Sequence, residues 1–118
     1  LTRREMSLEM GREVLSDLFQ NRGEKVSIET IQKIVSNYYN VRVADMKSER
    51  RNKSIAFPRM IAMFLSRKHT ACSFPEIGQR FGDRDHSTVM FACKKIQRML
   101  MGDSALRSTV ESIEKSLS

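Results

Sequence analysis

Apolar residues recur at intervals of three and four along the whole chain, whereas Val, Ile and aromatic residues nowhere alternate with polar ones over the length of a strand. Such spacing gathers apolar side chains on one face of a helix, which indicates an all-α protein. The 118 residues are enough for one small domain with a single core. No apolar run approaches the roughly 18 to 20 residues that a membrane helix needs. We therefore expect a helical bundle of about six to seven helices that requires no membrane.

Capping residues set the expected limits of these helices, because Ser, Thr and Asp favour helix starts and Gly and Asn favour helix ends. The first three expected helices run from Thr2 to residues 21–23, over residues 27–40 and over residues 44–47. A polar loop at 48–54 then leads into a fourth helix, which has Pro58 in its first turn. The last three cover residues 73–82, 85–102 and 103 onward. Their expected buried side chains are Ile28, Ile31, Ile34, Val35, Tyr38, Phe57, Met60, Ile61, Phe64, Leu65, Val89, Cys93, Ile96, Leu100, Leu106, Val110, Ile113 and Leu117.

The positive charge of the chain is concentrated in one segment. The sequence carries 21 Lys and Arg against 14 Asp and Glu, a net charge of +7. Residues 41–70 hold eight of those basic residues and two of the acidic ones, so this segment alone carries +6. A local field of one sign attracts a polyanion such as duplex DNA, RNA or an anionic membrane surface. A basic face that is merely solvated is the alternative, and charge alone leaves it open.

Residues 73–102 have the pattern of a short helix, a turn containing Gly82 and a longer helix with a polar start. This order is typical of a helix-turn-helix, whose second helix presents its first residues to the major groove of DNA. Ile77 and Phe81 are spaced to pack inward, and Gly78 is small where the two helices must approach each other. Helix pairs joined by a glycine turn also occur in bundles that bind no DNA, so both interpretations stay open.

The side chains at the start of the longer helix add chemistry to this pattern. Asp85 can accept from cytosine N4, His86 can bond a purine acceptor, and the hydroxyls of Ser87 and Thr88 can serve a base or a phosphate. Free N–H groups at a helix start also favour a phosphate. The alternative interpretation is that Asp85 only caps the helix and that His86 is an ordinary exposed residue.

Three segments carry a resemblance to a known family: residues 74–78 (FPEIG), 81–89 (FGDRDHSTV) and 92–96 (ACKKI). They closely resemble the signature of the DnaA family of bacterial replication initiators, in its C-terminal DNA-binding domain. The resemblance continues upstream of these segments to residue 26. It implies that residues 26–118 form an all-α helix-turn-helix domain and that residues 1–25 form a linker helix from a preceding ATPase region.

The same resemblance implies a function and a set of contacts. The domain would bind double-stranded DNA at short boxes of the replication origin, in the cytoplasm and on the nucleoid. Arg51 would enter the minor groove beside the box, and Asp85, His86 and Ser87 would face bases in the major groove. The phosphate contacts implied in the same way are Arg50, Lys53, Arg59, Arg67, Phe74, Pro75, Arg84, Thr88 and Lys94.

Three positions depart from the pattern of the family. Ser87 stands where the family usually has Thr, which removes a methyl group that would touch a thymine methyl. Asp83 replaces a usual Gly and places a non-glycine residue in the turn, and Phe91 replaces a usual His and is expected to enlarge the core contact. Asp85 and His86 keep their hydrogen-bonding groups, so we expect DNA binding of adjusted strength.

Neither catalysis nor a metal site is expected in this chain. DnaA-like initiators hydrolyse ATP, but the sequence has no G-x-x-x-x-G-K-[ST] loop, so ATP and magnesium are expected only in a longer parent protein. The two His and two Cys have no zinc-binding spacing, and neither Cys72 nor Cys93 has a catalytic base near it in sequence. We expect no cofactor here, a monomeric fragment, and self-assembly of the parent through regions outside it.

Two other functions remain open from the sequence. A transcription regulator of the helix-turn-helix class would have the same short helix, turn and long helix, although no heptad pattern for a dimer follows the last expected helix. A bundle that binds other proteins and whose basic face is incidental is the second alternative.

Overall fold

The computed structural model describes residues 26–117, and within them every regular element is a helix. The helices are α1 (Ile28–Tyr39), α2 (Val43–Met46), α3 (Lys53–His69), α4 (Phe74–Arg80), α5 (His86–Gly102) and α6 (Ser104–Leu117). The predicted all-α bundle with a helix-turn-helix is therefore confirmed. The linker helix expected over residues 1–25 lies outside the described residues. Between residues 26 and 117, none of the helices combines the length and the apolar character that crossing a membrane would take.

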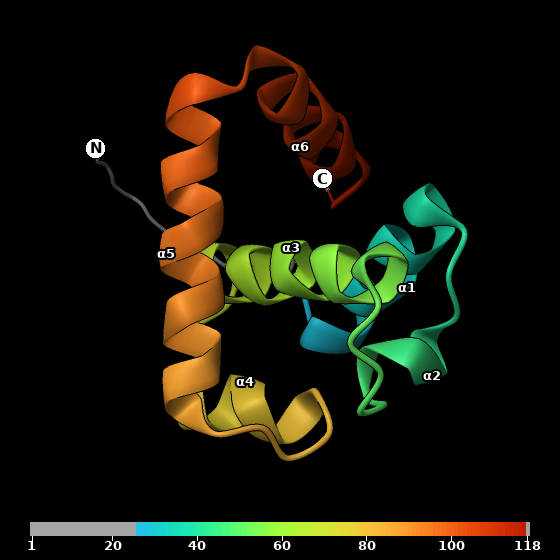
Figure 1. The fold of residues 1–118 in the computed structure, drawn as a ribbon, viewed down its shortest axis with the longest axis vertical. Helices are drawn as coiled ribbons and strands as arrows, with labels where there is room; N and C mark the ends of the chain where they lie inside the picture. Colours follow the sequence, from blue (N-terminus) through green and yellow to red (C-terminus); the bar gives the residue numbers. More distant parts are fainter. Residues whose placement is uncertain (1–25, 118) are drawn as a thin grey trace, which may run out of the picture.

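Helix α3 forms the centre of the bundle (Figure 1). It runs from α5 at one side to α1 and α2 at the other, α4 packs beside the first half of α5, and α6 turns back from the end of α5 toward α1. The core side chains of α3, Ile61, Met63 and Leu65, are almost completely buried. Fully buried side chains from the other helices surround this centre: Ile31, Val35, Met46, Ile77, Val89, Ile96 and Ile113.

The predicted caps explain where several helices begin and end. The hydroxyl of Ser27 accepts from the backbone N–H of Thr30 at 3.1 Å, and Asn40 ends α1 in the left-handed conformation at φ 56°. Before α4, the backbone N–H of Ser73 donates to Glu76 Oε1 at 2.8 Å and the N–H of Glu76 donates to Ser73 Oγ at 3.2 Å. Each bond satisfies a backbone donor that has no partner within its helix.

An acidic side chain of α6 contacts two basic side chains at the end of α3. Glu114 Oε2 lies 2.8 Å from Lys68 Nζ and 2.7 Å from His69 Nε2. Desolvation raises the pKa of Glu114, but hydrogen bonds from these two partners, together with their charges, outweigh it and hold that pKa below the usual 4.5. The C-terminal helix is thus attached by apolar packing and by one partly buried charged contact.

The structure corrects the expected start of the central helix. Helix α3 begins at Lys53, so Pro58 lies in its second turn and not in its first. The backbone carbonyl of Asn52 accepts from the N–H groups of Ile55 and Ala56, both at 2.9 Å, which closes the first turn well before the proline. The basic loop is correspondingly shorter than predicted, because its last residues belong to the helix.

Two aromatic residues predicted to pack in the core are exposed. Tyr38 is 51% exposed. Its neighbour Tyr39 takes the inward position, with its ring edge-to-face to Phe57 at a centroid distance of 6.3 Å. Phe91 is 63% exposed and does not enlarge the core, because it lies on the face of α5 opposite the buried Val89 and Ile96.

Candidate nucleic-acid interface

Helices α4 and α5 are joined by a tight turn over residues 81–85. Gly82 and Asp83 adopt positive φ angles of 84° and 57°, which reverse the direction of the chain. The N–H of Arg84 donates to the carbonyl of Gly78 at 2.9 Å, and a Cβ at position 78 would lie 2.1 Å from the Arg84 carbonyl oxygen. The close approach predicted at Gly78 is therefore confirmed, and it fixes where α5 begins.

The first turn of α5 projects four exposed polar residues, Asp85 to Thr88. Asp85 Oδ2 accepts from the backbone N–H of Ser87 at 3.0 Å and also from the hydroxyl of Ser87. These two hydrogen bonds lower the pKa of Asp85, so it is an ionised acceptor. Its other oxygen, Oδ1, lies 3.8 Å from His86 Nδ1 at the surface. Asp85 thus both caps the helix and presents a carboxylate oxygen to solvent.

The basic loop before α3 is attached to the helix-turn-helix at its root. The guanidinium of Arg84 donates to the carbonyl of Ser48 at 2.5 Å and to the carbonyl of Phe81. A Cβ at Gly82 would lie 2.3 Å from the carbonyl oxygen of Lys47, so the turn and the loop are in direct backbone contact. From this root, the exposed residues Arg50 and Arg51 continue toward α3.

Arg59 supports the same corner from the inside of the molecule. Its side chain is only 5% exposed, and its Nη2 donates to the carbonyl of Asp45 at 2.8 Å. Desolvation lowers the pKa of Arg59, as does the nearby charge of Arg84. Nη2 of Arg59 thus holds the backbone that leads into the basic loop, while Arg59 also lines the depression between the loop, α3 and α5. The phosphate contact expected at position 59 stays a prediction.

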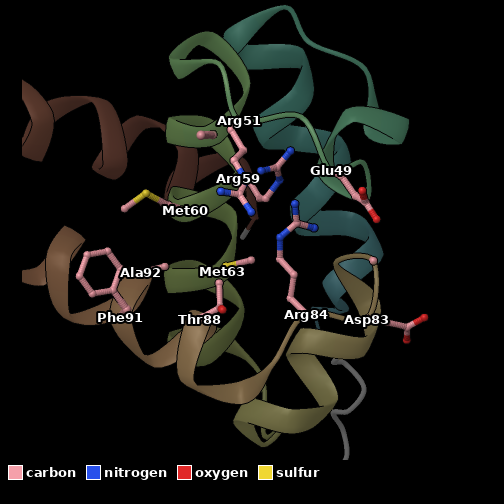
Figure 2. Close-up of a pocket in the computed structure, with 12 residues that line it drawn as sticks. Glu49, Arg51, Arg59, Met60, Met63, Asp83, Arg84, Thr88, Phe91 and Ala92 are labelled. Atoms are coloured by element: carbon pink, nitrogen blue, oxygen red, sulfur yellow. The ribbon is translucent and has the colours of Figure 1, made fainter.

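A depression of about 740 Å³ lies between the basic loop, α3 and α5. Figure 2 shows the side chains of Arg51, Arg59 and Arg84 gathered at its centre, with Thr88 and Phe91 of α5 along one wall. Its floor is apolar and contains Met60, Met63 and Ala92. Its lining contains three arginines and two acidic residues, Glu49 and Asp83, so the depression carries a net positive charge. The loop and the first turns of α5 therefore share one face of the molecule.

A second basic depression, of about 570 Å³, lies beside α5 next to α3 and α4. Arg67 stacks its guanidinium 4.2 Å from the ring centre of Phe74 and donates to the carbonyl of Cys72 at 3.1 Å. Lys94 lines the same depression, as does Cys93, whose thiol pKa is raised by burial. Residues of α5 that line the two depressions differ by about half a helical turn, so the depressions flank opposite sides of the helix.

The residues singled out from the sequence fall into distinct groups around α5. Arg51, Arg59, Arg84 and Thr88 line the first depression, and Arg67, Phe74 and Lys94 line the second. Asp85, His86 and Ser87 form the exposed tip of α5 and line neither depression. Arg50, Lys53 and Pro75 are exposed but line neither depression. Within residues 26–117, no three His, Cys, Asp or Glu side chains come together as metal ligands.

The sequence did not indicate that Arg59 and Arg84 hold backbone carbonyls. For Arg59 a signal was present: it follows Ile55 by four residues and precedes Met63 by four, so it lies on the buried register of its helix. For the contact of Arg84 with Ser48 no local signal exists, since the two residues are 36 positions apart.

Comparisons with known proteins agree with this geometry. The family described as "Bacterial dnaA protein helix-turn-helix" matches residues 28–96. The chain is 44% identical over 117 residues to the chromosomal replication initiator protein DnaA of Geobacter sulfurreducens, and 42% identical to that of Geobacter metallireducens. Each match covers 99% of this chain and 26% of the relative. A crystal structure of a DNA replication initiation factor matches at a TM-score of 0.69 and 34% identity, over 76% of this chain and 27% of that one.

Proposed function

Since the chain belongs to the bacterial DnaA family, as its helix-turn-helix part, we propose that it binds double-stranded DNA at short asymmetric boxes of a bacterial replication origin. One observation carries this proposal. The basic loop, through Arg51, and the first turn of α5, through Thr88, line the same positively charged depression. Two elements so placed can enter two neighbouring grooves of B-form DNA at once.

The proposed fit follows from the two depressions beside α5. A helix in the major groove has a sugar-phosphate strand on each side. In this arrangement the first depression receives the strand that separates the major from the minor groove, with Thr88 beside its phosphates. The second depression receives the strand on the far side, where Arg67 and Lys94 supply positive charge. Phosphate contacts on both sides set the position of the helix but carry no sequence information.

Base recognition is assigned to the tip of α5 and to the basic loop. Asp85, His86 and Ser87 present acceptors and donors to base edges in the major groove, and Asp85 retains a carboxylate oxygen for an amino group. Arg51 enters the minor groove, where narrow A·T-rich sequence concentrates negative potential and attracts arginine. The serine hydroxyl at position 87 keeps a hydrogen bond but offers no methyl group to a thymine.

The chain spans about a quarter of the length of its relatives, so the remaining functions are proposed for a longer protein. Residues 1–25 would link this domain, residues 26–118, to an ATPase region. That region would bind ATP and magnesium and would mediate self-assembly at the origin, while the present domain binds DNA as a monomer on the nucleoid. The family match describes the helix-turn-helix and not the ATPase part.

A fluorescence-anisotropy titration tests the proposal. One labelled duplex carries a box from the replication origin of the Geobacter sulfurreducens relative, and the other carries the same bases in scrambled order. We expect the box to bind roughly 10³-fold or more tightly than the scrambled duplex, with a log affinity that falls steeply as log salt rises. Equal affinity for the two duplexes would reject base recognition. Absence of binding at low salt would favour the protein-interaction alternative.

A further inference from the structure

Arg84 connects two parts of the interface that are far apart in the sequence. Its Nη2 donates to the carbonyl of Ser48, at the root of the basic loop, at 2.5 Å. Its Nη1 donates to the carbonyl of Phe81, at the end of α4. The planar guanidinium presents its donors in a rigid fork, so one side chain can hold both carbonyls at a fixed separation.

The position of Ser48 limits where the groove-reading arginine can lie. Ser48 precedes Arg51 by three residues, and an extended chain advances at most about 3.3–3.6 Å per residue, so their Cα atoms stay within roughly 11 Å of each other. Arg84 also directly precedes Asp85, the cap of α5. A contact between Arg84 and Ser48 therefore sets the distance from the loop to the tip of the helix.

The same contacts argue against Arg84 as a free phosphate ligand. Its side chain is half-buried, and both terminal nitrogens already donate to backbone oxygens. A phosphate bound there would have only the remaining N–H groups of a guanidinium that two carbonyls already hold in place. Arg51, by contrast, is an exposed residue of the same depression.

We infer that Arg84 is a positioning residue, which holds the root of the basic loop against the helix-turn-helix so that Arg51 and the tip of α5 are spaced for adjacent grooves. This inference rests on the proposed function, because the spacing matters only if both elements enter DNA. On this inference, Arg84 contributes to the preference for particular base pairs where Arg51 enters the minor groove, and not to the affinity for DNA of any sequence.

Two substitutions at this position separate positioning from phosphate binding. Arg84→Lys keeps the positive charge but cannot hold two carbonyls with one fork, and Arg84→Met removes the charge as well. Arg80→Met is the matched control, since Arg80 is an exposed arginine of the same helix-turn-helix that pairs with Glu29 of α1, away from the loop. Arg51→Ala marks the loss of the minor-groove contact itself.

The first measurement is hydrogen exchange in the free protein. We expect the hydrogen-bonded amides of Ser48 and Arg50 in the loop to exchange faster in Arg84→Lys and Arg84→Met than in the wild type or in Arg80→Met. Amides in the middle of α3 and α5 should keep their protection in all four proteins, which shows that the variants are folded. Unchanged exchange of the loop in both Arg84 variants would overturn the inference, whatever the DNA measurements give.

The second measurement compares a box with A·T pairs at its minor-groove flank and the same box with G·C pairs there. The wild type and Arg80→Met should prefer the A·T flank by about 5- to 150-fold, the range for one lost base contact. Arg84→Lys should lose most of this preference while still preferring box to scrambled duplex. In Arg51→Ala/Arg84→Lys the loss should be no larger than in Arg51→Ala alone.

A phosphate ligand would behave differently. Arg84→Lys would then keep the flank preference, Arg84→Met would weaken all duplexes alike and lower the salt slope by about one, and the losses at positions 51 and 84 would multiply. That result would overturn the inference and leave the proposed function intact. A wild type that does not distinguish box from scrambled duplex would reject the proposed function, and the exchange measurement alone would then decide the role of Arg84.

Discussion

Replacement of Gly78 by alanine measures how tightly the start of α5 packs against α4. An added Cβ would lie 2.1 Å from the carbonyl oxygen and 3.2 Å from the carbonyl carbon of Arg84. Both are backbone atoms, so no side chain can rotate away to make room. The turn itself would have to shift by about 1 Å before the contact became an ordinary overpacked one.

The expected cost follows from three effects. Alanine is favoured over glycine inside a helix by about 1 kcal/mol, which stabilises the variant. Overpacking costs about 1–3 kcal/mol. The shift also breaks the 2.9 Å hydrogen bond from the N–H of Arg84 to the carbonyl of Gly78, which contributes about 0.5–1.5 kcal/mol. Together these effects lower the free energy of unfolding of Gly78→Ala by about 0.5–3.5 kcal/mol, or roughly 4–8 °C in Tm for each kcal/mol.

Urea unfolding followed by far-ultraviolet circular dichroism gives this difference directly. Gly102→Ala is the control, because a Cβ at the last residue of α5 meets no atom within 4 Å. The control should be as stable as the wild type or more stable by up to about 1 kcal/mol. If Gly78→Ala is also as stable as the wild type, the packing of α4 on the turn is looser than the distance of 2.1 Å implies, and the reasoning fails.

Three further outcomes are expected. The pKa of Glu114 in the folded protein lies below 4.5, so its contribution to stability is present above pH 4.5 and is lost as the pH falls through that folded value. The urea midpoint of Glu114→Gln should therefore decline less than that of the wild type over this pH range, and parallel declines would contradict this. Ser73→Ala should destabilise the protein by about 1 kcal/mol in thermal unfolding through loss of the cap, and an unchanged Tm would argue against it. In DNA titrations, His86→Ala should lose about 1–3 kcal/mol of discrimination at one or two base pairs, whereas Arg67→Ala should weaken all duplexes alike; a change of box preference in Arg67→Ala would reject its assignment to phosphate.

Several helix boundaries could be predicted because they depend on neighbouring residues, whereas the start of α3 at Lys53 was not predicted. The capping box of Ser73 and Glu76, the Asp85 cap and the left-handed Asn40 all act within four positions in sequence. The exposure of Tyr38 could not be predicted in this way. Both Tyr38 and Tyr39 continue the helical spacing, and only the position of Phe57 on a different helix decides which ring turns inward.

The candidate site could be predicted only in part, because some of its contacts join residues that are far apart in the sequence. Exposed polar residues at a helix start carry their chemistry in their identity, so Asp85 and His86 stand out from the sequence alone. A basic residue does not reveal whether its charge meets a ligand or a backbone carbonyl. Arg59 and Arg84 look like further phosphate ligands in the sequence, and only the structure shows that each also donates to a backbone carbonyl, of Asp45 and Ser48 respectively.

Gly82 shows how the turn and the loop depend on each other. Its φ of 84° favours glycine on conformational grounds, and its place against the Lys47 carbonyl leaves no room for a Cβ. The first requirement belongs to the helix-turn-helix, and the second belongs to the basic loop. Asp83 can follow it because an aspartate tolerates the left-handed conformation and its side chain is exposed. A change in this turn therefore alters the angle of α5 and the position of the loop together, so the two elements proposed to enter adjacent grooves cannot vary independently.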